Sequence, residues 1–485
     1  MSIWSKYKSD ITFPSLQENK IVDTLIIGGG MTGLNSLYFL KDQENVCLVE
    51  ANEIGQGVSM NTTGKINYLQ DNTFVLSLKK GKTVLAQEQL ASQIYGMKLL
   101  LDIITKEQID CDLEAVTSYL VTNQESNVKI LKRVEHFLQE HHIEVTKLDR
   151  KLSFLYGIGV KDTFVFHPIK YMIGLCKALK KRNIYEHTKI LKIVAGENCY
   201  YCHTKDYCIR AKKVILACHY PFFLFPFLLP MRSSAEKSYL IAHRVKENEK
   251  YTYITLESPS QSVRFYQNGE DVYRICLGES HDISTKQNDE AHFKKVQSLF
   301  SIDESSIECV WSNVDLTTLD GRAYVGEIKP NLYLATGYQT WGMIQSALSG
   351  KILSDFVNNQ VNEYQHLFYP KRKSIDVYSQ ILVSGFKNTK SFLSSKYYPK
   401  SWYSNSLTFH FQHGKFIAIY NDEQGSHCVH PVCPHMKCGL IFNEVEKTWD
   451  CPCHSSRFDL DGQVIKGPSN YSIACNVKKT KTLHD

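Results

Sequence analysis

The chain has 485 residues, of which 43% are hydrophobic and 22% are charged, and its mean hydropathy is -0.27. This composition is that of a globular protein with room for two or three domains, and it excludes disordered, collagen-like and small disulfide-rich proteins. The net charge of +6 is small for this length, so nucleic acid is not an expected partner. No segment approaches the roughly 18 apolar residues that a transmembrane span requires.

The 15 cysteines are distributed unevenly along the chain. Residues 1–20 contain no apolar export signal, so we expect a cytoplasmic protein, in which cysteines are more often buried or metal-bound than paired. Residues 401–485 hold 6 of the 15 cysteines and 7 of the 18 histidines. Enrichment of both residue types in one short region indicates a metal site.

The first elements of the chain predict a dinucleotide-binding unit. Residues 22–27 form an apolar, β-branched strand, residues 28–33 read Gly-Gly-Gly-Met-Thr-Gly, and a helical pattern covers residues 34–40. A second strand, residues 46–49, ends at Glu50. In this order of elements Gly28, Gly30 and Gly33 permit the tight turn, the approach of a pyrophosphate and close helix packing, and Glu50 is placed to bind the ribose.

The remaining elements complete the predicted fold class. A helical stretch covers residues 78–101, and strands at 251–256, 263–266 and 273–277 suggest an inserted antiparallel sheet. A parallel-type strand at 332–335 precedes a second glycine turn and a helix at 343–357. We therefore expect an α/β doubly wound domain with an inserted antiparallel β substrate domain, followed by a small all-β module with strands near 415–420 and 449–451.

An apolar segment, residues 222–230, is too short and too rich in proline to cross a bilayer. A buried or interdomain loop is the favoured interpretation. A shallow contact with a membrane surface, which would make the protein peripheral at the membrane, is the alternative.

Five segments resemble the D-amino-acid-oxidase type of flavoprotein, which includes glycine and sarcosine oxidases. They are the small-residue loop at 51–65, Phe166-His167-Pro168, residues 214–219, residues 320–326 and residues 335–343. The resemblance implies FAD as cofactor. Its implied contacts are Gly28, Gly30, Gly33, Glu50, Thr62, Thr63, Lys65, Ile190, Gly337, Trp341, Gly342 and Met343.

Two further expectations concern the flavin chemistry. Residues 55–65 contain neither cysteine nor histidine, so we expect non-covalent flavin. A second glycine fingerprint for a pyridine nucleotide is absent, which indicates that electrons enter from an organic substrate. Arg264, in a strand of the substrate domain, is a candidate to bind a substrate carboxylate, and an exposed strand arginine is the alternative interpretation.

The C-terminal cysteines and histidines match a Rieske [2Fe-2S] centre. Cys433 and His435 form one pair, and Cys451 and His454 form a second. In such a centre two thiolates hold one iron and two imidazoles hold the other. Zinc is the rival interpretation. The proline after Cys451, the Ser456 hydroxyl and the Gly467-Pro468 loop favour the iron-sulfur cluster.

The module resembles the Rieske proteins of respiratory and photosynthetic complexes, in which the positions matching Cys438 and Cys453 form a disulfide. The resemblance implies this bridge, and two free thiols are the alternative. Lys437 and Ser455 replace the usual glycines, so the loop backbone could differ. Phe458 replaces a tyrosine that hydrogen-bonds a ligand sulfur in high-potential relatives, so we expect a potential in the lower or middle part of the range from about -150 to +300 mV.

Together the two parts resemble bacterial FAD-dependent oxidoreductases with a C-terminal Rieske domain. The expected domains are residues 1–375 for FAD and substrate, 376–400 for a helix or linker, and 401–485 for the Rieske module. The expected function is oxidation of an amine or amino-acid-like substrate, with electrons passing from flavin to the cluster and on to an external acceptor. An electron-transfer or redox-sensing protein without substrate turnover is the alternative.

Overall fold

The computed structural model describes residues 2–221, 229–283, 288–372, 406–412 and 414–475. The chain forms two compact units. The first comprises Met1–His219, Glu236–His281 and His292–Val377, and the second comprises Tyr220–Ala235, Asp282–Ala291 and Tyr378–Asp485. Most of the apolar segment at 222–230 and the expected linker at 376–400 lie outside the described residues. No helix in the described part of the chain combines the length and apolar character needed to span a bilayer.

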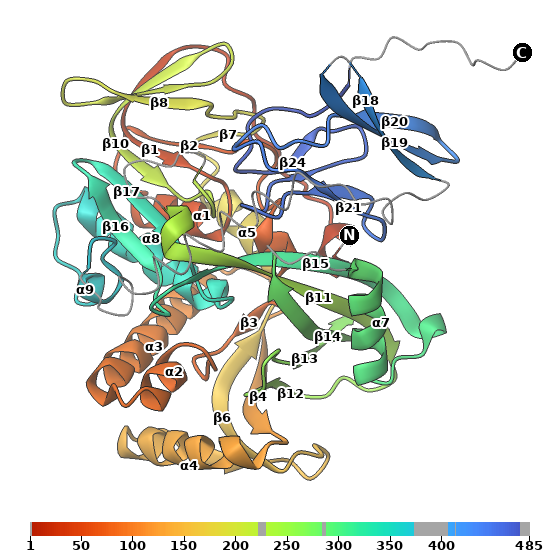
Figure 1. Ribbon diagram of the computed structural model, residues 1–485. Helices are drawn as coiled ribbons and strands as arrows, with labels where there is room; N and C mark the ends of the chain where they lie inside the picture. The colour runs from red at the N-terminus through yellow and green to blue at the C-terminus, as the bar shows by residue number, and fades with distance from the viewer. Residues whose placement is uncertain (1, 222–228, 284–287, 373–405, 413, 476–485) are drawn as a thin grey trace, which may run out of the picture. The chain divides into compact units, whose positions relative to one another are not determined.

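A largely parallel sheet organises the first unit (Figure 1). Its strand order is β16 (Tyr324–Lys329), β17 (Leu332–Thr336), β10 (Cys208–Leu216), β1 (Lys20–Ile27), β2 (Val46–Val49) and β7 (Asn183–Tyr185). The pairs from β17 to β7 are parallel, and β16 joins antiparallel. The hairpin of β8 (Lys192–Ala195) and β9 (Tyr200–His203) extends from β10. This is the expected doubly wound sheet, and β2 and β17 are buried along their whole length because helices cover such sheets.

The helices follow the sequence pattern with one informative difference. The expected helix at 78–101 is two helices, α2 (Phe74–Lys79) and α3 (Thr83–Lys106), because Gly81 adopts φ 73° between them. The other helices are α1 (Met31–Phe39), α4 (Glu125–Glu140), α5 (Pro168–Ala178), α6 (Leu229–Arg232), α7 (Asp289–Leu299), α8 (Gly342–Val357) and α9 (Gln365–Phe368), with 3-10 turns η1 (Ile3–Lys6), η2 (Val58–Asn61) and η3 (Glu304–Ser306).

The inserted sheet contains the expected strands and more. Its order is β15 (Ile307–Thr318), β11 (Ser233–Val245), β14 (Asp271–Asp282), β13 (Ser262–Asn268), β12 (Tyr251–Thr255), β4 (Glu114–Thr122), β6 (Tyr156–Val165) and β3 (Lys65–Ile66), with β5 (Val145–Lys147) beside β6. The hairpins β12–β13 and β13–β14 are antiparallel, whereas β12 pairs with β4 in parallel. The sheet is therefore mixed, because strands distant in sequence complete it.

The second unit contains two small antiparallel sheets. One has the order β18 (Leu407–Gln412), β19 (Lys415–Asp422) and β20 (Gly425–Val429). The other has the order β21 (Ile441–Asn443), β22 (Thr448–Asp450), β23 (Arg457–Phe458) and β24 (Val464–Lys466). Their shared core includes Val429, Leu440, Trp449 and Phe458, all with an exposed fraction of 0%. Cys433, His435, Cys451 and His454 lie on the loops that this core supports.

The turn between β15 and β16 is anchored by a buried ion pair. The Asp320 carboxylate accepts hydrogen bonds from Arg372 Nε and Nη2, both at 2.7 Å, and from Arg322 Nη2 at 2.8 Å. Burial opposes ionisation, but the Arg372 and Arg322 guanidinium groups outweigh it and lower the pKa of Asp320 to about 2. The carboxylate therefore stabilises the fold above its ordinary pKa, and this contribution is lost as the pH falls through about 2.

We predict that Asp320→Asn destabilises the first unit by about 3–5 kcal/mol, because it leaves two largely buried guanidinium groups without their counter-charge. Thermal unfolding followed by the release of flavin fluorescence measures the change, with the exposed Asp42→Asn as control. An unchanged release temperature would show that the ion pair is dispensable.

Candidate flavin and iron-sulfur sites

The glycine turn after β1 allows close approach of backbone atoms. Gly28 has φ 115°, and a Cβ atom there would lie 2.6 Å from the Ala217 carbonyl oxygen. A Cβ at Gly33 would lie 1.8 Å from the Gly28 carbonyl oxygen, so α1 can pack here only with glycine. Gly30 is the N-cap of α1 and provides no side-chain cap. The helix N-terminus and the bare turn therefore fit a pyrophosphate.

Backbone hydrogen bonds bring the segment of Ile190 next to Glu50. Glu50 accepts hydrogen bonds from the Gly29 and Asn52 N–H groups at 2.6 and 2.9 Å. Burial raises the pKa of Glu50, and these backbone hydrogen bonds oppose the shift. Ile190 is buried two residues after Thr188, whose N–H group donates to the Glu50 carbonyl at 2.8 Å. The two predicted contacts are thus held near each other by backbone hydrogen bonds.

Arg264 holds the small-residue loop at 51–65, named the flavin loop below, in place. It extends from β13 and is 1% exposed. Its Nη1 donates to the carbonyls of Thr63, Gly64 and Phe166 at 2.8, 2.8 and 2.9 Å. Burial lowers the pKa of Arg264 to about 9, so the three carbonyl dipoles compensate a desolvated cation.

The structure places Arg264 differently from the expected substrate contact. Its Nε also donates to the Phe265 carbonyl at 3.1 Å. Arg264 is not among the residues that line the cavity described below. It is also not the exposed strand arginine that was the alternative. The guanidinium connects the flavin loop, the start of α5 and the inserted sheet, which is a positioning role.

The second glycine turn joins β17 to α8. Gly337 has φ 73°, and a Cβ there would lie 2.5 Å from Thr318 Cγ2. The Tyr338 hydroxyl lies 2.8 Å from Thr32 Oγ1 and so connects this turn to α1. Trp341 is the N-cap of α8 and its Nε1 donates to Asp71 Oδ1 at 3.0 Å.

A cavity lies between the flavin loop, the second turn and the inserted sheet. Six of the predicted contacts line it: Thr62, Thr63, Lys65, Trp341, Gly342 and Met343. About 780 Å³ within it, open solvent included, is not filled by protein atoms. The glycine cradle and this cavity together suit an elongated dinucleotide whose ring reaches the cavity.

Sequence reasoning missed the polar residues of the cavity. Glu236 and Ser238 come from β11, and Asn313 and Asp315 come from β15. Each pair is spaced by two residues, so both members point to one face of their strand. This alternation was a readable signal, but the sequence did not show that these two strands border the flavin loop.

Two ionisable groups near the ring site have shifted pKa values. Burial lowers the pKa of Lys65 to about 7, and its Nζ donates to the Tyr253 carbonyl at 3.0 Å and to Ser262 Oγ. Burial also raises the pKa of Asp71 to about 6, against the effect of the Trp341 hydrogen bond. Such shifts concentrate at functional sites, which supports this cavity as the reaction site.

The predicted iron ligands form two pairs in the second unit, in which Cys433, Cys451 and His454 are buried and His435 is partly buried. The imidazoles of His435 and His454 have ring centroids 5.1 Å apart, and the Nδ1 atom of each is buried without a partner among the described residues. Burial lowers the pKa of both histidines, that of His454 to about 3, so both are neutral. Neutral imidazole nitrogens without hydrogen-bond partners fit metal coordination.

The two thiols are close enough to share a proton. A hydrogen bond between Cys433 and Cys451 lowers the pKa of Cys433 to about 7 and raises that of Cys451. Cys433 also receives hydrogen bonds from Ser456 and from the His435 and Met436 backbone. A second thiolate here needs a cation, so the group suits iron better than it suits two free thiols.

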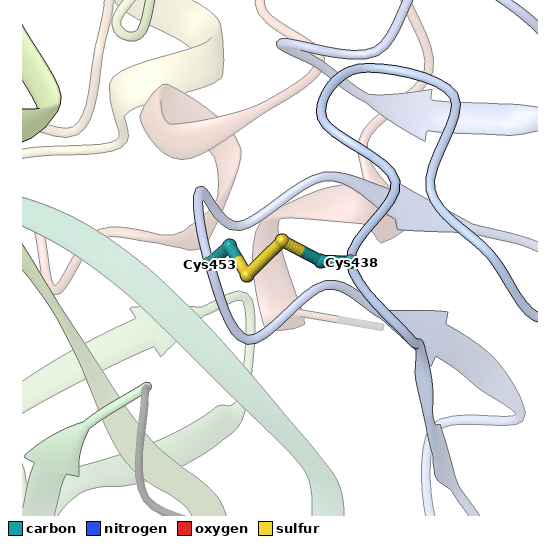
Figure 2. The surroundings of a disulfide bond; sticks show 2 residues. All are labelled: Cys438 and Cys453. Atoms are coloured by element: carbon teal, nitrogen blue, oxygen red, sulfur yellow. A yellow bond between two sulfur atoms is a disulfide. The ribbon is translucent and has the colours of Figure 1, made fainter. Parts of the chain in front are cut away.

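Cys438 and Cys453 form the disulfide that the resemblance implied, with an Sγ–Sγ distance of 2.05 Å (Figure 2). The Cys451 sulfur lies within 4.8 Å of both of these sulfurs. The three would make a metal-binding group only if the disulfide were reduced. The bridge therefore leaves Cys433, Cys451 and the two histidines as the ligand set that we propose.

The loops keep a glycine-like backbone without glycine. Lys437 and Ser455 have φ 62° and 59°, so side chains occupy left-handed conformations at the two positions that usually carry glycine. The Ser469 N–H group donates to Ser456 Oγ at 2.9 Å, which ties the Gly467-Pro468 loop to the ligand loop.

Tyr220 belongs to the second unit, although the residue before it, His219, belongs to the first unit. Its ring centroid lies 5.7 Å from that of His454. The buried Tyr220 hydroxyl has no hydrogen-bond partner among the described residues. An aromatic side chain of the second unit therefore lies beside a predicted iron ligand.

Family models match both parts of the chain. The model of the FAD dependent oxidoreductase family matches residues 23–356, and that of the Rieske [2Fe-2S] domain matches residues 402–478. A Bacillus subtilis protein, YhfW, named as a Rieske 2Fe-2S iron-sulfur protein, is 29% identical over 481 residues, which cover 94% of each chain.

Solved structures show the fold of the flavin part. Glycine oxidase from Geobacillus kaustophilus has a TM-score of 0.61 and 16% identity, and the match covers 73% of this chain and all of that one. L-proline dehydrogenase from P. horikoshii has a TM-score of 0.60 and 12% identity, with 74% and 98% covered. The flavin part therefore has the fold of amino-acid oxidases, and FAD and a [2Fe-2S] cluster are the cofactors of the two domains.

We predict that the double variant Cys438→Ala, Cys453→Ala loses its cluster faster than the native protein. The bridge spans 15 residues, and closing a loop of that length stabilises by about 3 kcal/mol. Decay of the cluster's visible circular dichroism during mild heating measures the loss. The variant Cys208→Ala, at a partly exposed free thiol in the first unit, is the control. Equal decay rates would contradict a stabilising bridge.

We predict that Phe458→Tyr raises the midpoint potential of the cluster. Phe458 is fully buried beside the ligand loop and offers no hydrogen-bond donor, whereas a hydroxyl there would donate to a ligand sulfur. Redox titration followed by EPR gives the potential. A native potential near the top of the range of about -150 to +300 mV, or no rise in the variant, would refute this expectation.

Proposed function

Because the chain belongs to the FAD dependent oxidoreductase family, we propose that it oxidises an amine or amino-acid-like substrate and sends the electrons through its Rieske cluster to an external acceptor. The observation that carries this proposal is the presence, in one chain, of a polar cavity beside the flavin loop and of two imidazoles and two thiols arranged for iron.

The residues of the first unit have defined parts in the proposed reaction. Bound FAD would supply a two-electron acceptor, and a bound [2Fe-2S] cluster would supply a one-electron carrier. The turn at Gly28, Gly30 and Gly33 holds the pyrophosphate, and Glu50 binds the ribose. Thr62, Thr63 and Lys65 line one side of the ring site, Gly342 and Met343 line the other, and the inserted sheet positions the substrate.

Electron exit through the second unit has its own support. Cys433, Cys451, His435 and His454 would hold the cluster, and the Tyr220 ring lies beside His454 within the same unit. Glycine oxidase and L-proline dehydrogenase, which share the fold of the first unit, are named for amino-acid chemistry, which supports a C–N bond as the target.

We also propose that the protein acts in the cytoplasm. Eleven of the 15 cysteines are neither bridged nor proposed iron ligands, and such free thiols are usual in a reducing compartment. The bridge between Cys438 and Cys453 is the exception, and Cys438 is 2% exposed.

Anaerobic mixing with amines and amino acids tests the function. We expect the visible absorbance of the flavin to bleach, and the EPR signal of the reduced cluster to follow. Bleaching would establish substrate oxidation. Absence of bleaching with every candidate would favour the alternative, an electron-transfer or redox-sensing protein without turnover.

The variant His454→Ala is the matched control for electron exit. It removes one proposed iron ligand and leaves the cavity unchanged, so we expect flavin bleaching at the native rate without the EPR signal. A native EPR signal in this variant would contradict the ligand assignment.

A further inference from the structure

The cavity presents two carboxylates to its contents. Glu236 lies on β11 and Asp315 lies on the adjacent strand β15. Both side chains are only partly buried, and Glu236 accepts a hydrogen bond from the Ser280 hydroxyl, which also lines the cavity. Carboxylates near an enclosed ligand favour a cation, since an opposite charge at short range offsets the loss of hydration.

Asn313 provides a second and independent observation. It lines the same cavity and is 7% exposed, and its Oδ1 atom has no hydrogen-bond partner among the described residues. Its Nδ2 donates to Asp315 Oδ2 at 2.9 Å, which fixes the orientation of the amide. A buried acceptor of this kind needs a donor, and an N–H group of a ligand would supply it.

The positive charge that lines the cavity is already hydrogen-bonded to protein groups. Lys65 is the one cationic side chain among the described residues that line the cavity, and two of its three donors bind the Tyr253 carbonyl and the Ser262 hydroxyl. The nearby Arg264 donates to backbone carbonyls. A substrate carboxylate would therefore meet Glu236 and Asp315 without a dedicated guanidinium partner, at a cost in desolvation and repulsion.

We propose that this cavity recognises organic ammonium ions rather than amino-acid zwitterions, with Glu236, Asp315 and Asn313 Oδ1 as the acceptors for the ammonium group. The proposal narrows the substrate class of the proposed function to amines without a carboxylate on the carbon that bears the nitrogen. The proposal rests on that function only for the conclusion that the bound ammonium ion is a substrate. Recognition itself can be measured without turnover.

A pair of ligands that cannot be oxidised tests the recognition. tert-Butylammonium and 2-aminoisobutyrate both lack hydrogen on the carbon next to nitrogen, and they differ by one carboxylate. Each is titrated into the FAD-loaded full-length protein, and the change in the visible spectrum of the bound flavin gives the dissociation constant. We expect the dissociation constant of tert-butylammonium to be lower than that of 2-aminoisobutyrate by a factor of about ten or more.

Variants of the acceptors locate the ammonium. Glu236→Gln and Asp315→Asn should each raise the dissociation constant of tert-butylammonium by about tenfold or more, because each removes a charge-assisted hydrogen bond. The exposed Glu304→Gln, which removes a carboxylate outside the cavity, is the matched control and should leave the constant unchanged. Native FAD content and circular dichroism verify that each variant is folded.

Tighter binding of 2-aminoisobutyrate would overturn the proposal and assign the substrate carboxylate to Lys65. Absence of any spectral change with tert-butylammonium, or native affinity in both acceptor variants, would overturn it as well. None of these results bears on substrate oxidation, whose failure is recognised separately by the absence of flavin bleaching with oxidisable amines and amino acids.

Discussion

The buried guanidinium of Arg264 is the interaction on which the first unit depends. It brings the carbonyls of Thr63 and Gly64, from the flavin loop, and of Phe166, before α5, to a single Nη1 atom. The ring centroids of Trp4 and Tyr266 lie 5.1 and 5.8 Å from Arg264 Cζ. Burial of a cation without a carboxylate is costly, and the carbonyl dipoles and ring faces compensate part of that cost. The same loop provides Thr62, Thr63 and Lys65 to the cavity, so the shape of the reaction site follows from this contact between distant segments.

Both candidate sites share one physical property, which is that their protein groups are incomplete without a ligand. In the first unit a helix N-terminus and a glycine turn suit an anion, and Asn313 Oδ1, which has no partner among the described residues, suits a donor. In the second unit two neutral imidazoles and a pair of thiols need metal ions to satisfy them. A flavin that accepts electron pairs and a cluster that carries single electrons are complementary, which gives a reason for their fusion in one chain.

The sequence predicted those parts of the sites that depend on local spacing. Gly28, Gly30 and Gly33 act within one turn, and Cys433, His435, Cys451 and His454 lie on two short loops, so their geometry was readable from adjacent residues. The role of Arg264 was not, because its three partners lie about 100 to 200 residues away in the chain. Glu236 and Asp315 were missed for the same reason, since pairing of distant strands brings them to one cavity. The break at Gly81 was missed because helical periodicity continues across it.

The most direct test of the account is the kinetics of cluster reduction after rapid anaerobic mixing with an oxidisable amine, measured by freeze-quench EPR at several protein concentrations. If electrons pass from the flavin to the cluster of the same chain, the cluster is reduced with a first-order rate constant that does not depend on protein concentration. A rate that rises in proportion to concentration would show transfer between molecules and contradict an internal electron route. Flavin reduction without any cluster signal would contradict the coupling of the two sites.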